Sequence, residues 1–279
     1  MSYTYNTLQV QISGPLANVI IDNPPVNVIT GELFADLLSL FEELSADPQL
    51  TVVVIKSKNP DFFLAHFDVE ILLELADGNT EEAASTLESY QRMLKGIREM
   101  DKVIIGQIEG RIGGGGSELA MNFDMRFGVI GKTIINQMEV PLGILPGGSG
   151  TQMLPRLVGR GRAMEVILAG DDIDAETAER WGLLNRIFAE DEIDAWVAKL
   201  AARIASMPAT ALRTAKKSID CSSKPLEEGL KDESKLFVDL LFTAEAKQQM
   251  TKFMDQGGQT PQGELRIAAL GQQICRSDD

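Results

Sequence analysis

The sequence has few of the residues on which several classes of functional site depend. Its two cysteines, Cys221 and Cys275, are far apart and form no CxxC or Cys/His pattern. A zinc site or a disulfide framework is therefore not expected. His66 is the only histidine, so a hydrolase with a Ser-His-Asp triad would have to use this one residue as its base. We expect no metal site.

Long apolar runs and a surplus of positive charge are also missing. No apolar run approaches the roughly 20 residues of a membrane span, and residues 1–9 lack the apolar segment of a signal peptide. The 26 Lys and Arg against 41 Asp and Glu give a net charge of −15. This balance disfavours nucleic acid or an anionic membrane as a partner. An anionic ligand would need backbone N–H groups or a few well-placed lysines, and the expected compartment is the cytoplasm.

The 279 residues, 44% of them hydrophobic, are enough for a sizeable core. In the first part of the chain, strand patterns alternate with helical ones, which predicts an α/β core with βα crossovers. After about Arg156 the patterns are mostly helical, with Pro208 and Pro225 as breaks, and the polar segment 256–279 is either an arm on a neighbouring subunit or a loose tail. Strands are predicted at 8–12, 16–21, 51–55, 103–108 and 133–139, an apolar loop at 61–68, and helices at 30–44, 80–100, 117–123, 163–169, 175–181, 193–207, 209–221 and 226–255.

A glycine run, RIGGGGSE at residues 111–118, follows a predicted buried strand and precedes a predicted helix. Four glycines permit a close approach of another backbone segment. The free N–H groups and the dipole of the following helix would stabilise negative charge on an oxygen. The alternative is a tight turn without a ligand. No Gly-Lys-Ser/Thr follows, so the run is not a Walker loop, and its spacing does not match the dinucleotide fingerprint.

Two glutamates stand out near this run. Glu118 is expected in the first turn of the helix, where it would be either a partner of the helix dipole or a functional group. Glu139 lies in the apolar stretch IINQMEVPL, where an unpaired carboxylate would be costly. Two carboxyl groups that converge in an apolar site can supply acid and base near neutral pH. Whether these two converge depends on the fold.

Five segments, in order, resemble motifs of the crotonase superfamily, the enoyl-CoA hydratase/isomerase family, and the match runs from about Leu8 to Met254. The resemblance implies a spiral of ββα turns with a helical C-terminal region. It implies an acyl-CoA-binding core at 1–205, a helical trimerisation region with a polar tail at 206–279, and a homotrimer or hexamer. The segments are 23–29 (NPPVNVI), 63–68 (FLAHFD), 110–124 (GRIGGGGSELAMNFD), 139–143 with 146–159 (PGGSGTQMLPRLVG), and 174–182 (DAETAERWG).

The same resemblance implies an acyl-CoA thioester as substrate, with coenzyme A as part of that substrate and no separate cofactor. The thioester carbonyl would meet the backbone N–H groups of Phe67 and Gly115. Glu118 and Glu139 fall on the positions that hold the attacking water in the hydratases of the family. The remaining positions implied to contact the substrate are Val26, Val28, Ala65, His66, Asp68 and Gly114.

The chain also departs from the family pattern. His66 replaces a usual glycine and would be strained at positive φ; it serves structure, coenzyme A binding or catalysis. Phe67 is bulkier than the common alanine, Asn136 and Met138 replace glycine and proline, and Met153 replaces arginine. The leading hypothesis is syn hydration of a 2-enoyl-CoA. Isomerisation, hydrolysis or carbon–carbon cleavage of an acyl-CoA are the alternatives, and non-catalytic binding of acyl-CoA is disfavoured because both glutamates are present.

Overall fold

The computed structural model describes residues 3–275, and its first compact unit is built around a six-stranded sheet. The order of the strands is β1-β2-β3-β5-β7-β10, and all neighbours are parallel except β1 and β2, which form an antiparallel hairpin. The strands are β1 (Leu8–Ser13), β2 (Leu16–Ile21), β3 (Val52–Ser57), β5 (Val103–Ile108), β7 (Met125–Val129) and β10 (Arg186–Phe188).

A second, four-stranded sheet has the order β4-β6-β8-β9, with only β8 and β9 antiparallel. The chain alternates between the two sheets in a repeating pattern: one strand in the larger sheet, one strand in the smaller sheet, then a helix. The strand pairs of this repeat are β3–β4, β5–β6 and β7–β8. This repeat is the expected spiral of ββα turns. Its short strands are β4 (Phe62–Leu64), β6 (Arg111–Gly113), β8 (Ile134–Asn136) and β9 (Ile173–Asp174).

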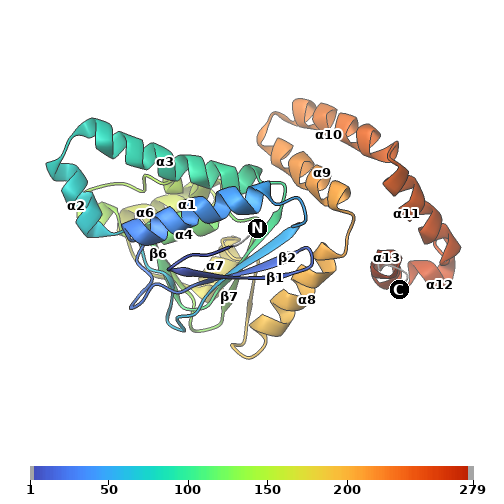
Figure 1. Ribbon diagram of the computed structural model, residues 1–279, viewed down its shortest axis with the longest axis horizontal. Coiled ribbons are helices and arrows are strands. Elements are labelled where there is room, and N and C mark those ends of the chain that lie inside the picture. Colours follow the sequence, from blue (N-terminus) through green and yellow to red (C-terminus); the bar gives the residue numbers. More distant parts are fainter. Residues whose placement is uncertain (1–2, 276–279) are drawn as a thin grey trace. The chain divides into compact units, whose positions relative to one another are not determined.

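Several helices of this unit bury an apolar face, and α1 shows the pattern most clearly. In α1 the buried residues Leu33, Leu37, Leu40 and Leu44 recur at helical spacing, and the side chain of Thr30 caps the first turn. Helices α1 and α3 run side by side (Figure 1). The helices are α1 (Gly31–Ala46), α2 (Val69–Asp77), α3 (Thr80–Glu99), α4 (Gly114–Met121), η1 (Val140–Leu142), α5 (Gly150–Val158), α6 (Arg160–Ala169) and α7 (Ala175–Trp181).

Several local predictions differ from the structure. The apolar segment 61–68 is not simply a loop, because residues 62–64 pair with β6 as strand β4. Helices α2 and α5 were not anticipated: α2 begins where Asp68 caps it, and α5 lies within the glycine-rich segment 146–159. The predicted strand at 133–139 is shorter and ends at Asn136.

The second compact unit is helical, and the division falls between Ala198 and Lys199, inside α8. The expected domain boundary after residue 205 stays a prediction. The single helix predicted at 226–255 is in fact two helices, because Thr243 accepts a hydrogen bond from Ala246 N and caps a new helix. The elements are α8 (Ile193–Ala205), α9 (Ala209–Asp220), η2 (Cys221–Ser223), α10 (Leu226–Leu241), α11 (Ala244–Asp255), α12 (Pro261–Glu264) and α13 (Ile267–Ile274).

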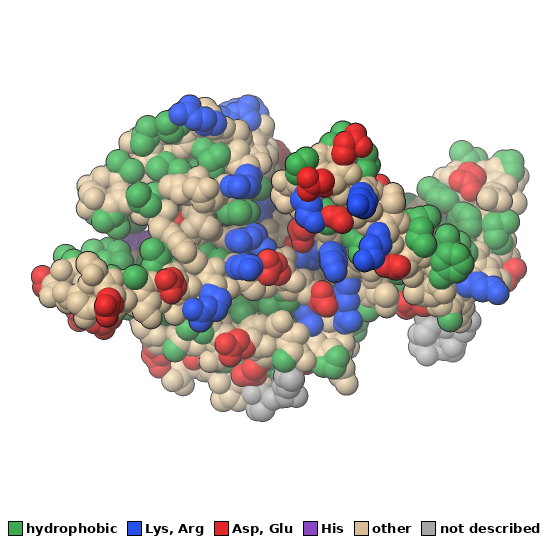
Figure 2. Space-filling model, turned by 90° about the horizontal axis from the view of Figure 1, so that it is seen from above, with side chains coloured by type: hydrophobic (Ala, Val, Ile, Leu, Met, Phe, Trp, Pro, Cys, Tyr) green, Lys and Arg blue, Asp and Glu red, His purple; other side chains and the backbone are tan. Residues whose placement is uncertain are grey.

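Large apolar side chains are exposed on this helical unit. Phe237 is 62% exposed on α10 and Phe242 is 83% exposed just after it. Figure 2 shows hydrophobic side chains gathered on the surface of the unit.

The segment 256–279, expected to be an arm or a tail, contains α12 and α13 up to Ile274, and residues 276–279 lie outside the described part of the chain. Between residues 3 and 275 no helix combines the length and apolar character that crossing a membrane requires.

Candidate active site

The glycine run packs directly against the segment that follows β4. A Cβ atom on Gly116 would lie 2.4 Å from the carbonyl oxygen of Leu64, and one on Gly113 would lie 2.8 Å from that of Ala65. Both distances are shorter than any side chain tolerates. Gly114 in addition has a φ of +43°, a conformation that favours glycine. The glycines are therefore required by a close approach of two backbone segments.

Helix α4 begins at Gly114, three residues earlier than predicted. Glycines 114–116 are thus the first turn of the helix, and no acidic residue lies in that turn. The predicted place of Glu118 in the first turn is wrong, and the helix dipole alone does not explain this carboxylate.

Beside this helix start, two backbone N–H groups have no protein acceptor within the described part of the chain. Gly115 is the second residue of α4, so its N–H has no acceptor within the helix. Phe67 forms an isolated bridge with Ile29, in which Ile29 N donates to His66 O and Asp68 N donates to Ile29 O. This pairing turns the N–H of Phe67 away from Ile29. Among residues 3–275, neither amide donates a hydrogen bond to a protein group.

The two amides are neighbours on one cavity. A Cβ on Gly115 would lie 3.4 Å from Phe67 N. The cavity has a volume of about 360 Å³ and a mostly apolar lining that includes helices α2 and α3. It is lined by His66, Phe67, Val69, Leu72, Leu75, Ala76, Ala83, Thr86, Leu87, Tyr90, Gly114, Gly115, Glu118, Met138, Glu139, Leu142, Ile144, Leu145, Gly147 and Gly148. Both predicted donors and both predicted glutamates therefore line the same space.

Glu118 is held by the loop that precedes α5. Its side chain is 3% exposed, and its Oε1 accepts a hydrogen bond from Gly150 N at 2.7 Å. Burial is the largest influence on its pKa and, with the charge of Glu139, raises it to about 8, while the N–H groups of Gly150 and Gly148 partly oppose the rise. A carboxyl group with this pKa is mostly protonated at neutral pH.

Glu139 reaches the same cavity from the turn before η1. It is 8% exposed, and its Oε2 is buried without a hydrogen-bond partner among the described residues. Burial raises the pKa of Glu139, while a hydrogen bond from its own backbone N–H and the nearby His66 oppose the rise. The two glutamates are thus buried, electrostatically coupled carboxyl groups, a combination typical of acid–base sites.

Sequence reasoning missed Tyr90, which lines the cavity from α3. Its hydroxyl donates to Gly115 O at 2.5 Å, and its ring packs edge-to-face on Phe34 and Phe67, with both centroid distances 5.8 Å. Burial, with the charges of Glu118 and Glu139, raises the pKa of this hydroxyl well above its ordinary value, so it remains a donor. A tyrosine on an amphipathic helix looks like a core residue, and no sequence signal distinguishes it.

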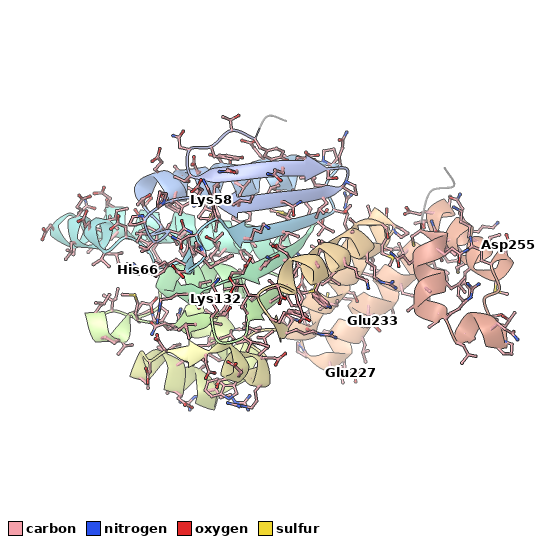
Figure 3. The ribbon with its side chains drawn as sticks, turned by 90° about the horizontal axis from the view of Figure 1, so that it is seen from below. Lys58, His66, Lys132, Glu227, Glu233 and Asp255 are labelled. Atoms are coloured by element: carbon pink, nitrogen blue, oxygen red, sulfur yellow. The ribbon has the colours of Figure 1, made fainter. Side chains whose placement is uncertain are left out.

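His66 lines the cavity without backbone strain. Its φ is not positive, so the replacement of a glycine requires no left-handed conformation. Its Nδ1 lies 2.9 Å from Phe67 O. Figure 3 shows the residue in the part of the chain from which α2 extends. The half-exposed imidazole therefore stands beside one donor amide and near Glu139.

The other predicted substrate contacts are distributed differently. Gly114 lines the cavity, whereas Val26, Val28, Ala65 and Asp68 do not. The 23–29 segment is nevertheless tied to the segment after β4, because Ala65 N donates to Asn27 O and the Asn27 side chain donates to Phe63 O. The side chain of Asp68 accepts from Glu70 N and caps α2.

Similarity to known proteins covers most of the chain. Residues 11–261 match the family described as enoyl-CoA hydratase/isomerase. The chain is 31% identical over 256 residues to a probable enoyl-CoA hydratase of Rhizobium meliloti, covering 90% of this chain and 96% of that protein. It is 29% identical over 253 residues, with the same coverages, to the crotonyl-CoA hydratase of Syntrophomonas wolfei. A solved enoyl-CoA hydratase structure from Geobacillus kaustophilus has a TM-score of 0.85 at 27% identity, covering 91% of this chain and 95% of that one.

Proposed function

This chain belongs to the enoyl-CoA hydratase/isomerase family, and we propose on that premise that it adds water across the double bond of a 2-enoyl-CoA thioester. It is an acyl-CoA-processing enzyme of the enoyl-CoA hydratase type. One observation supports the proposal above the others. Phe67 and Gly115, whose N–H groups donate to no protein group within residues 3–275, line one cavity together with Glu118 and Glu139, whose carboxyl groups are buried.

In the proposed reaction the thioester oxygen accepts hydrogen bonds from Phe67 N and Gly115 N. These donors stabilise the negative charge that appears on the oxygen when water attacks the β-carbon, and each is worth about 3 kcal/mol in well-studied enzymes. A C–O bond forms at the β-carbon, the double bond shifts to give an enolate, and protonation at the α-carbon restores the thioester. The product is a 3-hydroxyacyl-CoA.

The two glutamates supply the proton transfers in this scheme. With a pKa of about 8 for Glu118 and a raised pKa for Glu139, the pair retains at least one proton at neutral pH. One carboxylate then takes a proton from the attacking water, while the other carboxyl group delivers one to the α-carbon. The step leaves the base protonated and the acid ionised, and a proton passes from the first to the second through solvent water after the product leaves, which restores the starting state.

We further propose that the coenzyme A moiety runs along the segment that contains Val26 and Val28 and along Ala65. Backbone contacts there would suit a protein with a net charge of −15. The exposed apolar side chains of α10 and Phe242 are proposed to lie in a subunit interface of a homotrimer or a hexamer.

Isomerisation, hydrolysis and carbon–carbon cleavage use the same oxyanion site and remain the alternative reactions. The presence of two carboxyl groups favours hydration, because addition of water requires both a base and an acid. The test is incubation with a series of 2-enoyl-CoA, 3-enoyl-CoA and saturated acyl-CoA esters in H₂¹⁸O, with products identified by mass spectrometry. Hydration predicts a 3-hydroxyacyl-CoA with ¹⁸O in the hydroxyl group; a shifted double bond or a free acid from every ester would reject it.

A further inference from the structure

Gln137 lies next to the proposed oxyanion site and has no role in the mechanism above. It is 1% exposed and sits two residues before Glu139. Its Nε2 donates to Gly114 O at 3.1 Å and to Asn136 O at 3.3 Å. Both partners are carbonyl oxygens, which only accept hydrogen bonds, so the amide nitrogen and not the amide oxygen of Gln137 faces them.

The carbonyl of Gly114 belongs to the same peptide unit as the N–H of Gly115. A hydrogen bond accepted by a peptide carbonyl polarises the whole unit and strengthens its N–H as a donor. The side chain of Gln137 thus acts on the opposite end of the amide that is proposed to bind the thioester oxygen. It also restrains the orientation of that peptide at the point where β6 turns into α4.

Gln137 also lies against Gly150, the residue whose backbone N–H donates to the Glu118 carboxyl group. A Cβ on Gly150 would lie 2.6 Å from Gln137 Oε1 and 2.9 Å from Glu118 Oε1, so both side chains pack on this glycine, whose N–H holds Glu118. Within the described part of the chain, Gln137 Oε1 is buried and has no hydrogen-bond partner. A buried amide with an unsatisfied oxygen is costly, and an apolar side chain would avoid that cost. Packing alone therefore does not account for a glutamine here.

We propose that Gln137 is a positioning residue that orients and polarises the Gly114–Gly115 peptide as a donor to the thioester oxygen. The inference rests on the proposed function, since it assigns Gln137 a part in the same oxyanion site. The residue does not touch the substrate; it acts through the peptide that does.

The expected size of the effect follows from two magnitudes. Loss of a whole oxyanion donor lowers kcat by about 10²–10³, and a neighbouring hydrogen bond strengthens its partner by about 10–30%. We take the hydrogen bond from Gln137 to supply about 10–30% of the free-energy contribution of the donor, and hence the same share of the logarithm of its rate effect. Removing that bond alone should then lower kcat about two- to eightfold. KM should change less, because most of the ligand is bound elsewhere.

The test compares Gln137→Leu with Gln107→Leu as a matched control. Gln107 is 2% exposed and donates to Glu109 and Asp194, but it does not line the cavity. For each variant, kcat and KM are measured with a 2-enoyl-CoA that the parent hydrates. The carbonyl stretching frequency of bound butyryl-CoA, labelled with ¹³C at the thioester, is measured by difference infrared spectroscopy. Gln137→Met, with a side chain of similar length, is used if the leucine variant does not fold.

In the parent, the carbonyl band of bound butyryl-CoA should lie below that of the free ligand. The Gln137 variant should show a smaller displacement together with the loss in kcat, whereas Gln107→Leu should keep both parental values. An unchanged band and unchanged kcat in the Gln137 variant, or equal changes in the control, would overturn the inference. If the parent protein shifts the carbonyl band of bound butyryl-CoA but hydrates no 2-enoyl-CoA, the proposed reaction is rejected. The band shift in the Gln137 variant would then still test the role of Gln137.

Discussion

Replacement of Glu118 by glutamine should lower activity and, at neutral to alkaline pH, make the protein more stable. Glu118 is buried, and its pKa in the folded protein is raised from 4.5 to about 8. The amide of glutamine is close in shape to the protonated carboxyl group, and its oxygen can still accept the hydrogen bond from Gly150 N. The variant therefore keeps the geometry and removes the titration.

The sign of the effect follows from proton linkage. Because the folded-state pKa is the higher one, the unfolded chain loses its proton at about pH 4.5 while the folded protein keeps it up to about pH 8. The contribution of Glu118 to stability is therefore fully present below pH 4.5 and falls as pH rises through that window. At about 1.4 kcal/mol per pH unit, the loss amounts to about 3 kcal/mol at pH 7, an order-of-magnitude value.

The assay is the free energy of unfolding from urea titrations of the parent and Glu118→Gln between pH 4.5 and 8.5. The difference should grow in favour of the variant as pH rises. Glu165→Gln, which removes an exposed charge on α6, reports the effect of a charge change alone. In the same preparations, turnover of a 2-enoyl-CoA by Glu118→Gln should fall by roughly 10² or more. A stability difference independent of pH across this range would refute the assignment of a buried, mostly protonated carboxyl group.

Three further predictions concern other parts of the molecule. Glu139→Gln should lower turnover by roughly 10² or more, whereas the dissociation constant of butyryl-CoA, measured by calorimetry, should change little; near-normal hydration would disprove its role. Gly116→Ala places a methyl group 2.4 Å from Leu64 O, so its melting temperature should fall and the loss of stability should be on the order of 2 kcal/mol or more; an unchanged melting curve would contradict the close approach. Light scattering at micromolar concentration should give the mass of a trimer or hexamer, and Phe237→Asp, on the exposed face of α10, should reduce it; a monomeric parent would reject the interface.

Side chains from several parts of the chain surround the donor amides of Phe67 and Gly115. The ring of Phe67 packs edge-to-face with those of Phe34 and Tyr90. The Tyr90 hydroxyl bonds to Gly115 O, while Gln137 bonds to Gly114 O. Two consecutive carbonyls at the start of α4 are therefore held by side chains from different parts of the chain. This arrangement restrains the donor helix without occupying the cavity.

Much of the secondary structure is determined by local sequence. The β-branched runs at 16–21 and 103–108 form strands with those bounds, and the apolar spacing in 30–44 forms α1. These patterns succeed because hydrophobic periodicity and capping act over a few residues. The family resemblance and the need for glycine at 113–116 were also readable from the sequence. The reason for those glycines was not, since the atoms they approach lie about 50 positions earlier in the chain.

Only the tertiary structure brings the chemistry together. Glu118 and Glu139 meet in one cavity because β6 and β8 are neighbours in the smaller sheet, and the elements that follow these strands carry the two side chains. The raised pKa of Glu118 comes from burial and from the loop at Gly150, and no local pattern encodes either. Within residues 3–275 the N–H of Phe67 donates to no protein group, because Ile29 pairs with His66 and Asp68 on either side of it. Sequence determined which groups were available; long-range packing decided their distances, their solvation and hence what they can do.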